Sequence, residues 1–328
     1  MQAIVIRDHG GPEVLRSEDV PVPVPGPAEV LVRHHAIGVN FVDTQHREGK
    51  PYPVKLPLIP GTEAAGVIAA VGSAVTGCWV GDRVGYAGPM GSVCAEYGVV
   101  AADRIVPVPD AVSFEQAAAV LLQGMTAHAL TQSVYAVQPG DYVLIHAASG
   151  GVGLNLVQMA KQRGGIVIGT VSSAGKADAV RAAGADHILE YADFAAETLR
   201  ITAGAGVQVI YDGVGQATFD QSLPLLRAMG HMVVYGLASG NIPPFDVNRL
   251  SGITGSGERG SLFLTWATLS DYNARPEDLQ RRAADVLGWV ANETLRVTIA
   301  AVLPLAEAAQ AHRLLESRQT IGKIVLIP

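Results

Sequence analysis

The feature of this sequence that most constrains its fold is the stretch DYVLIHAASGGVGLNLVQMAK, residues 141–161. An apolar run ends near Ala147, a glycine-rich turn follows, and a helix-forming run comes after the turn. The turn fits the pattern G-x-G-x-x-G with Ala148 in the first place, Gly150 in the second and Gly153 in the third. A strand that leads through such a turn into a helix offers backbone N–H groups and the positive end of the helix dipole to a phosphate. The stretch therefore predicts a dinucleotide-binding unit, and the alternative is a glycine-rich turn that binds nothing.

Strand-like and helix-like runs alternate after this turn. The helix-like runs end in glycine, as helix C-termini often do. Apolar strands that alternate with helices are typical of a parallel sheet covered on both faces. The strand-like runs are residues 141–147, 166–171, 186–191, 207–214 and 231–237, and the helix-like runs are residues 154–164, 176–184, 194–204 and 218–230.

The two ends of the chain have a different pattern. Up to about residue 125, short strand-like runs alternate with glycine and proline, and Ser113 with Gln116 forms a capping box before a helical run. The tail combines two helix-like runs with a last strand, KIVLIP. Two such ends around one doubly wound unit predict a discontinuous domain with a nucleotide-binding domain inserted. The predicted parts are residues 1–124 and 266–328 for the discontinuous domain and residues 125–265 for the inserted one.

Composition and charge exclude several classes of protein. No apolar run reaches the ~20 residues that a membrane helix needs, and the first residues lack the apolar core of a signal peptide. The net charge is −7 without a run of lysine or arginine, which argues against a dedicated nucleic-acid surface. The two cysteines, Cys78 and Cys94, form no CxxC pattern, so we expect buried or half-buried thiols in a cytoplasmic protein.

The end of the second predicted strand indicates which dinucleotide binds. An NAD site usually carries Asp or Glu there to bind the ribose 2′-hydroxyl. This chain has Ser172 and Ser173 at that place, and Lys176 follows. Hydroxyls and an ammonium favour a 2′-phosphate, and Tyr191, which closes the third strand, can add a hydroxyl or stack on adenine. We therefore expect NADPH rather than NADH, and the alternative is that Lys176 is an ordinary solvated lysine at a helix start.

These segments resemble the medium-chain dehydrogenase/reductase superfamily and, within it, the zinc-free quinone oxidoreductases related to zeta-crystallin. The resemblance covers essentially the whole chain. It implies an α/β fold in which a Rossmann doubly wound parallel sheet is inserted into a discontinuous, GroES-like, β-rich catalytic domain. The segments that carry it are HGGPEVL (9–15), AIGVNFVDT (36–44), PGTEAAGVI (60–68), VGDRV (80–84), HAASGGVG (146–153), YDGVG (211–215) and ESRQTIGKIVL (316–326).

The resemblance also implies that this chain binds no zinc. Zinc-dependent relatives have cysteine where Asn40 lies and histidine where Thr62 lies, and Glu63 alone cannot form a three-ligand site. Without a Lewis acid to stabilise an alkoxide, alcohol oxidation becomes difficult. A conjugated acceptor, such as a quinone or an α,β-unsaturated carbonyl, suits such a site because it delocalises the negative charge that reduction creates.

Three catalytic candidates follow from the resemblance. Asn40 is the first, because its amide can hold the nicotinamide ribose or carbonyl or donate to the acceptor oxygen; the alternative is a turn-forming asparagine. Asp43 lies on the same turn. Tyr52 is a candidate aromatic wall, since Gln45 stands where relatives often have tyrosine; the alternative is a half-exposed loop tyrosine. Glu63 is expected to be structural.

The resemblance further implies a set of cofactor-binding residues that come from many segments. For Arg318 the alternative is a solvated arginine at a helix end. In addition to Asn40, Ser172, Lys176 and Tyr191, the set consists of Gln123 and Thr126 beside the nicotinamide, Gly150, Gly151 and Val152 in the glycine turn, Gly213 after the fourth strand, Tyr235, Gly236 and Ser239 after the fifth, Leu262 and Phe263 on the sixth, and Arg318 in the tail.

The function that these observations favour is an NADPH:quinone oxidoreductase that works without zinc. One alternative is an NADPH-dependent alkenal or enone reductase of the same fold, and another is a non-catalytic, crystallin-like protein that binds NADPH or RNA. Relatives pair through an edge of the nucleotide-domain sheet, and the apolar segment SLFLTWATL (261–269) is a candidate edge strand. We therefore expect a homodimer, although a buried sixth strand within one subunit explains the same residues.

Overall fold

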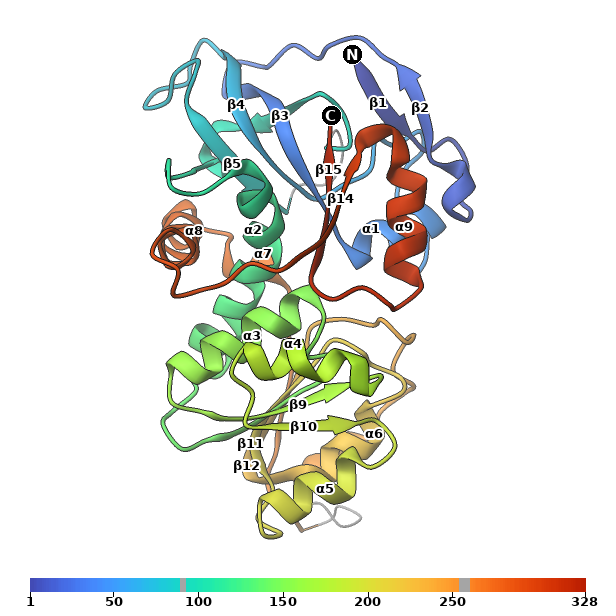
Figure 1. Cartoon of the computed structure of the whole chain (residues 1–328), viewed down its shortest axis with the longest axis vertical. Helices are drawn as coiled ribbons and strands as arrows, with labels where there is room; N and C mark the ends of the chain where they lie inside the picture. The colour runs from blue at the N-terminus through green and yellow to red at the C-terminus, as the bar shows by residue number, and fades with distance from the viewer. Residues whose placement is uncertain (89–92, 254–259) are drawn as a thin grey trace. The chain divides into compact units, whose positions relative to one another are not determined.

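The computed structural model describes residues 1–88, 93–253 and 260–328. The chain divides into two compact units, one made of residues 1–125 and 272–328 and the other of residues 126–271 (Figure 1). The divisions fall within helix α2 (Phe114–Ala129) and helix α7 (Leu269–Tyr272). The first unit is therefore built from both ends of the chain, as the fold prediction required.

The second unit contains one parallel sheet. Its strand order places the first strand of the unit in the middle of the sheet, which is the order of a dinucleotide-binding doubly wound fold. Every adjacent pair in it is parallel. Across the sheet, the strands are β10 (His187–Glu190), β9 (Ile166–Val171), β8 (Tyr142–Ile145), β11 (Val207–Asp212), β12 (Leu226–Val234) and β13 (Phe263–Trp266).

Helices cover both faces of this sheet, with α3 and α4 on one face and α5 and α6 on the other (Figure 1). Helix α3 packs against β8 and β9 because its apolar residues, among them Leu156 and Val157, face the sheet and are fully buried. The helices are α3 (Gly151–Gln162), α4 (Ala177–Ala182), α5 (Phe194–Ile201) and α6 (Phe219–Ser222).

One predicted helix is much shorter than expected. The run 218–230 forms only α6 and a single 3₁₀ turn at Leu223–Leu225, and β12 begins at Leu226. Pro224 explains the difference, since a proline has no N–H to donate and its ring clashes with the preceding helical turn. The five predicted strands of this sheet are confirmed, although their observed ends differ from the predicted ones by a few residues.

The first unit is built on a mainly antiparallel sheet. In this sheet β14 and β15 are parallel, and the remaining pairs are antiparallel. A separate antiparallel pair joins β1 (Gln2–Val5) to β2 (Arg16–Asp19). In spatial order the larger sheet contains β14 (Ile299–Pro304), β15 (Lys323–Ile327), β3 (Glu29–Val39), β4 (Glu63–Val71), β5 (Arg83–Ala87) and β7 (Val106–Pro107), and β6 (Tyr97–Ala101) pairs with β3.

The pairing of β15 with β3 joins the two ends of the chain. Ile324, Val325 and Leu326 lie opposite Val39, Gly38 and Ile37, respectively, and all but Gly38 of this group are buried apolar residues of the core. Because the register fixes which side chains of β15 face inward, it also fixes the position of Lys323, the first residue of the strand.

Helices pack around this sheet. The capping box predicted for α2 is confirmed: Gln116 N donates to Ser113 Oγ (3.2 Å), and Ser113 N donates to Gln116 Oε1 (3.0 Å). No helix in the described ranges is long and apolar enough to span a bilayer. Besides α2, the helices of this unit are α1 (Phe41–Glu48), α8 (Pro276–Ala291) and α9 (Ala308–Glu316).

The glycines of α3 and α8 provide a matched pair for a stability test. A Cβ at Gly153 would lie 2.3 Å from the Ala147 carbonyl oxygen, whereas a Cβ at Gly288 would meet nothing within 4 Å. We expect Gly153→Ala to lower the free energy of unfolding by ~1–3 kcal/mol through overpacking. Gly288→Ala should raise it by ~0.4–1 kcal/mol, because alanine restricts the unfolded chain. Urea denaturation of both variants checks this, and a neutral Gly153→Ala would contradict the close packing.

Candidate active site

The glycine turn between β8 and α3 is shaped to leave the start of the helix open. Ala147 takes a left-handed backbone conformation (φ 51°), and Gly150 is the N-cap, which has no side chain to bond the first helical N–H groups. Gly153 packs directly on the turn, since its Cα approaches the Ala147 carbonyl too closely for a side chain. The N–H groups of Gly151 and Val152 have no intrahelical acceptor, as in any first helical turn. The turn therefore fits a pyrophosphate.

Tyr191 supports this turn from the end of β10. Its hydroxyl oxygen accepts a hydrogen bond from Ala147 N (2.8 Å), and its ring lies near those of His146 (6.0 Å between centroids) and Phe194 (6.3 Å). His146 itself is fully buried, bonded to Thr170 Oγ1 (3.0 Å), and burial lowers its pKa. Tyr191, which sequence analysis predicted to bind the cofactor, thus holds the glycine turn in place through Ala147 N.

A buried aspartate shapes the loop after β11. Asp212 is fully buried, and its Oδ1 accepts hydrogen bonds from Val214 N (2.7 Å) and Gly215 N (3.0 Å). Its Oδ2 accepts one from the Thr218 hydroxyl (2.8 Å). Sequence analysis quoted this residue within YDGVG without giving it a role. The signal was an acidic residue at the end of a strand that is mostly apolar.

The loop after β12 packs against the loop after β11. A Cβ at Gly213 would lie 2.7 Å from the ring of Tyr235, and one at Gly236 would lie 2.9 Å from the Gly213 carbonyl oxygen. Ser239 Oγ accepts a hydrogen bond from Ala217 N (2.9 Å) and donates to Val214 O (2.8 Å), which ties the two loops together. Burial, and then the nearby Asp212 carboxylate, raises the pKa of Tyr235.

Apart from Thr126 on α2, the candidate residues of the second unit gather at one edge of the sheet, with two exceptions. The glycine turn, Ser172, Lys176 and the loops after β10, β11 and β12 all follow the carboxyl ends of parallel strands, which is where doubly wound sheets bind ligands. Leu262 and Phe263 lie instead at the amino end of β13, where Phe263 pairs with His231 and stacks on its ring (4.4 Å). Their contact with the nicotinamide stays a prediction, and in this register the residue at the carboxyl end of β13 is Trp266.

The surroundings of β9 fit an additional phosphate. The strand ends at Val171, and residues 172–176 include two serines and a lysine but no acid. Ser172 is exposed and Lys176 is half-buried, and burial lowers the pKa of Lys176. A hydroxyl and an ammonium at this place suit a 2′-phosphate rather than a free ribose hydroxyl.

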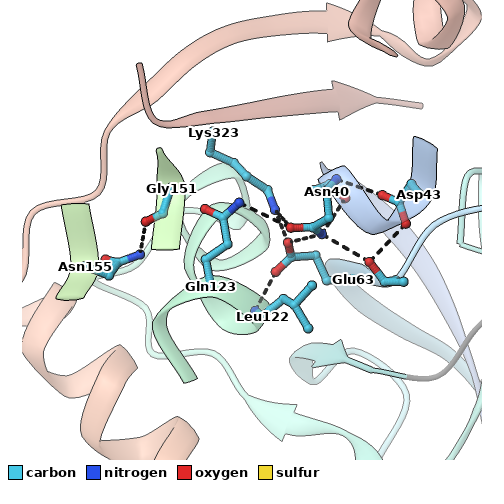
Figure 2. A network of polar contacts seen from close by, with 10 residues as sticks. Asn40, Asp43, Glu63, Leu122, Gln123, Gly151, Asn155 and Lys323 are labelled. Carbon is cyan, nitrogen blue, oxygen red and sulfur yellow. Dashed lines mark hydrogen bonds and ion pairs between the residues drawn. The ribbon is translucent and has the colours of Figure 1, made fainter. Parts of the chain in front are cut away.

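Two of the catalytic candidates, Asn40 and Asp43, lie in a buried polar network of the first unit (Figure 2). Asn40 Nδ2 donates to Glu63 Oε1 (2.7 Å) and Thr62 Oγ1 (3.1 Å). Asn40 Oδ1 accepts hydrogen bonds from Lys323 Nζ (2.6 Å) and Gln123 Nε2 (3.2 Å). An amide group offers two donor hydrogens and two acceptor lone pairs. All four are therefore taken by protein groups, and Asn40 reaches a ligand only by giving up one of these bonds.

Lys323 is the residue that sequence analysis missed. Its side chain is almost fully buried, and its ammonium forms an ion pair with Oε1 of Glu63. Glu63 is itself fully buried. Glu63 Oε2 also accepts a hydrogen bond from Leu122 N in α2 (2.7 Å), as Figure 2 shows. A lysine at the start of an otherwise apolar strand, KIVLI, was the available signal, because a buried ammonium requires a counter-ion. Glu63 has the structural role that we expected.

Asp43 is held at the edge of this network. Its Oδ2 accepts a hydrogen bond from Asn40 N (2.7 Å), and its Oδ1 accepts one from the Thr62 hydroxyl (3.2 Å). Burial raises the pKa of Asp43 to about 7, although the Asn40 N–H, the Lys323 charge and the Thr62 hydroxyl oppose the rise. A carboxyl group with such a pKa can hold and release a proton near neutral pH.

The remaining candidates lie outside the network. Tyr52 is 37% exposed, and its ring is 6.3 Å from that of His46. Arg318 is exposed just after α9 and has a left-handed backbone conformation. Thr126 follows Gln123 by one helical turn on α2. The structure thus brings together Asn40, Asp43 and Gln123, with Glu63 and Lys323 as additional members.

Comparison with known proteins places the chain in a family. Residues 26–110 match the model of the alcohol dehydrogenase GroES-like domain, and residues 151–275 match that of the zinc-binding dehydrogenases. A quinone oxidoreductase of Pseudomonas aeruginosa is 43% identical over 324 residues, which make up 98% of this chain and 97% of that protein. The chain belongs to the quinone oxidoreductase family. This family is a branch of the medium-chain dehydrogenase/reductase superfamily.

Other relatives also match this chain over its whole length. A 2-haloacrylate reductase of a Burkholderia species is 40% identical over 335 residues, covering 100% of this chain and 99% of that protein. The structure of Escherichia coli quinone oxidoreductase complexed with NADPH aligns over 100% of both chains with a TM-score of 0.95 and 38% identity. The fold prediction is therefore confirmed.

The donor set of this quinone oxidoreductase family member does not fit zinc. Asn40 offers an amide whose groups are all bonded, Thr62 offers a neutral hydroxyl, and the Glu63 carboxylate already pairs with the Lys323 ammonium. A zinc ion would have to displace that ammonium from its counter-ion. Within the described part of the chain, no three His, Cys, Asp or Glu residues are grouped to hold a metal.

The raised pKa of Asp43 predicts a pH-dependent contribution to stability. Its folded-state pKa of about 7 lies above the ordinary value of 3.8, so between these values the folded protein holds a proton that the unfolded chain has released. The free energy of unfolding then falls as pH rises through this window, by up to ~1.4 kcal/mol per pH unit. Asp43→Asn removes the titration. In urea denaturation, we expect the free energy of unfolding of wild type to fall relative to that of Asp43→Asn as pH rises from 4 to about 7. If the two proteins show parallel pH profiles, Asp43 does not have a raised pKa.

Proposed function

We propose that this chain is an NADPH-dependent quinone reductase that works without zinc. The observation that carries the proposal is the coexistence, in one chain, of an open glycine turn at the start of α3 and a buried network whose donors do not fit zinc. Quinone oxidoreductases that match almost the whole chain support it. The overall reaction is quinone, NADPH and a proton giving hydroquinone and NADP⁺.

The residues that would hold the cofactor follow from the sheet edge described above. The N–H groups of Gly151 and Val152 would bind the pyrophosphate, and Ser172 and Lys176 would bind the 2′-phosphate. Bound NADPH supplies the reducing equivalents, as a hydride or as single electrons. We also retain Tyr235 and Gly236 as cofactor-side residues, because they lie after β12 at the same edge.

Asp43 is the residue that we propose as proton store. Reduction of a quinone consumes protons, and Asp43 has a pKa of about 7 because it is buried. In the protonated form, its carboxyl group can donate to Thr62 Oγ1, which lies 3.2 Å from Oδ1. The Thr62 hydroxyl hydrogen is then free to point elsewhere, so a proton at Asp43 changes the donor that Thr62 presents.

A second candidate function is the reduction of an activated carbon–carbon double bond. The 2-haloacrylate reductase of Burkholderia is nearly as similar to this chain as the quinone oxidoreductases are. Its named substrate class is conjugated like a quinone, so the same delocalisation argument applies. Both candidate functions use NADPH, so only the acceptor that is reduced distinguishes them.

The proposed function is tested by turnover. Purified protein should oxidise NADPH with a simple benzoquinone and should do so much more slowly with NADH. A panel that includes an alkenal and 2-chloroacrylate separates the two candidate functions through their kcat/KM values. NADPH binding without oxidation by any quinone or enone would favour a non-catalytic role.

Lys176 provides the sharper test of cofactor choice. We expect Lys176→Ala to raise the KM for NADPH by at least ~10-fold, because it removes a charge-assisted contact to the 2′-phosphate. The KM for NADH should stay unchanged, since NADH lacks that phosphate. Lys55→Ala, at an exposed lysine in the other unit, is the matched control. An unchanged preference for NADPH in Lys176→Ala would exclude this phosphate site.

We also propose that the protein is a homodimer formed through β13. This strand is the last in the parallel sheet, and three of its large apolar side chains are well exposed: Phe263 (43%), Leu264 (37%) and Trp266 (49%). An edge strand with such side chains is suited to extend the sheet of a second copy.

Sedimentation velocity tests the dimer. Trp266→Lys places a charge on the proposed edge and should convert the dimer to a monomer. Trp79→Lys is the control, because Trp79 is also exposed (67%) but lies in the other unit. A wild-type protein that sediments as a monomer at micromolar concentration would refute the proposal.

We propose a cytoplasmic location and three sequence parts, residues 1–124, 125–265 and 266–328. The free thiols of Cys78 and Cys94 suit a reducing compartment. The two compact units, residues 1–125 with 272–328 and residues 126–271, support boundaries near these positions.

A further inference from the structure

We infer that the first unit carries a second ligand site, a cavity beside Arg83 that takes a small organic carboxylate with an apolar body. The cavity has a volume of about 590 Å³, a size that is common for small-molecule sites. Its lining comes from the loop after β4, the start of β5, β7 and α8, which contribute Cys78, Arg83, Pro107 and Gln280, respectively. All of these elements belong to the first unit. This site is independent of the proposed function.

The cavity is separate from the polar network around Asn40. Strand β5 connects the two places, because its first residue, Arg83, lies opposite Val67 and its last residue, Ala87, lies opposite Glu63. At ~3.3 Å per residue, the two ends of the strand are ~13 Å apart. A ligand in the cavity therefore leaves the network and its proposed proton store untouched.

The guanidinium of Arg83 is held in one orientation. Its Nη2 donates a hydrogen bond to Val112 O (2.5 Å), and its Cζ lies 4.1 Å from the centre of the Phe114 ring, which is a cation–π contact. Its Nε is buried and has no hydrogen-bond partner among the residues that the structure describes. Because two contacts already fix this side chain, little freedom is lost when its remaining donor binds a ligand.

A carboxylate of the chain itself shows which chemistry suits this donor. Asp110 Oδ1 lies 3.7 Å from Arg83 Nε, close enough for an ion pair but too far for a hydrogen bond. The Asp110 side chain is fully exposed, so the pair contributes little and the aspartate can move into solvent. A carboxylate on a ligand can take its place at hydrogen-bond distance and form a charge-assisted bond with Arg83.

The rest of the lining favours an apolar body on the ligand. Val84, Ile105 and Val108 line the cavity and are buried side chains, so a ring or alkyl group can pack against them. Asp82 also lines the cavity, but its Oδ2 accepts a hydrogen bond from Trp79 N (2.8 Å) and is committed to its own loop. An acid with its carboxylate at Arg83 and its apolar part on the valines satisfies both halves of the site.

The test measures binding of a defined probe. Naphthalene-2-carboxylate is the probe, and naphthalene-2-carboxamide, which has the same rings without the charge, is the matched control ligand. By isothermal titration calorimetry, the full-length protein should bind the acid at least ~10-fold more tightly than the amide, because only the acid forms a charge-assisted bond.

Cys78 reports where the probe binds. It lines the cavity and is half-buried, so the acid at saturation should slow its alkylation by N-ethylmaleimide. Burial, and then Asp82, raises the pKa of Cys78, so the reaction is run at about pH 8.5 and followed by peptide mass spectrometry. Cys94 is buried and serves as the internal reference that does not react.

Two substitutions should change the affinity in opposite directions. Arg83→Gln removes the donor and its charge, and should weaken binding of the acid at least ~10-fold. Asp110→Asn removes the competing carboxylate from an exposed position and should tighten binding about 3-fold. Neither change should alter the affinity for the amide to a similar extent. Arg16→Gln, at an exposed arginine of β2, is the matched control and should bind the acid as wild type does.

Three results would overturn the inference: no binding of the acid at ~1 mM, equal affinity for acid and amide, or binding that leaves the alkylation of Cys78 unchanged. If circular dichroism shows that Arg83→Gln does not fold, Asp110→Asn decides, and an unchanged affinity of this variant for the acid would refute the site. No readout requires turnover, so a protein that reduces no quinone can still show this site, and one that reduces quinones can still lack it.

Discussion

The burial of one ammonium organises the catalytic half of this chain. Lys323 lies almost fully out of water, and such a charge is tolerated only with a counter-ion and satisfied hydrogen bonds. Glu63 supplies the charge, Asn40 supplies an acceptor, and the same Glu63 also bonds the backbone of α2 through Leu122. Four segments distant in sequence are therefore held together by a single electrostatic cluster: the turn after β3, β4, α2 and β15.

The resemblance to zinc-dependent dehydrogenases implies that Asn40 and Thr62 in this cluster stand where those proteins have metal ligands. A divalent cation and an ammonium both neutralise a glutamate, but only the metal acts as a Lewis acid with open coordination positions. The ammonium is saturated with local partners and cannot polarise a carbonyl directly. Its influence has to pass through the amides that it orients, which is why the chemistry suits an acceptor that stabilises its own negative charge.

Much of the fold could be predicted from the sequence because its signals are local. The glycine turn, the capping box of Ser113 and Gln116 and the apolar strands all depend on neighbouring residues, and the structure confirms them. The failures came from non-local effects. The sequence did not show at which end of β13 Phe263 lies, because strand register depends on pairing with β12. Lys323 was missed because its partners lie 260 and 283 residues away. A sequence shows that a charge is unusual in a strand but does not show which residue neutralises it.

The division of the first unit between both ends of the chain has a consequence for synthesis on the ribosome. Asn40 emerges 283 residues before Lys323, and the whole segment 126–271 emerges in between. The inserted unit has every strand of its own sheet and can fold as soon as it leaves the tunnel. Until β15 arrives, Glu63 lacks its cation, and residues 37–39 of β3 have one unpaired edge, since β6 pairs only with residues 29–33. Nascent chains therefore pass through an interval in which the buried polar network lacks its ammonium and a short strand edge is open to chaperones.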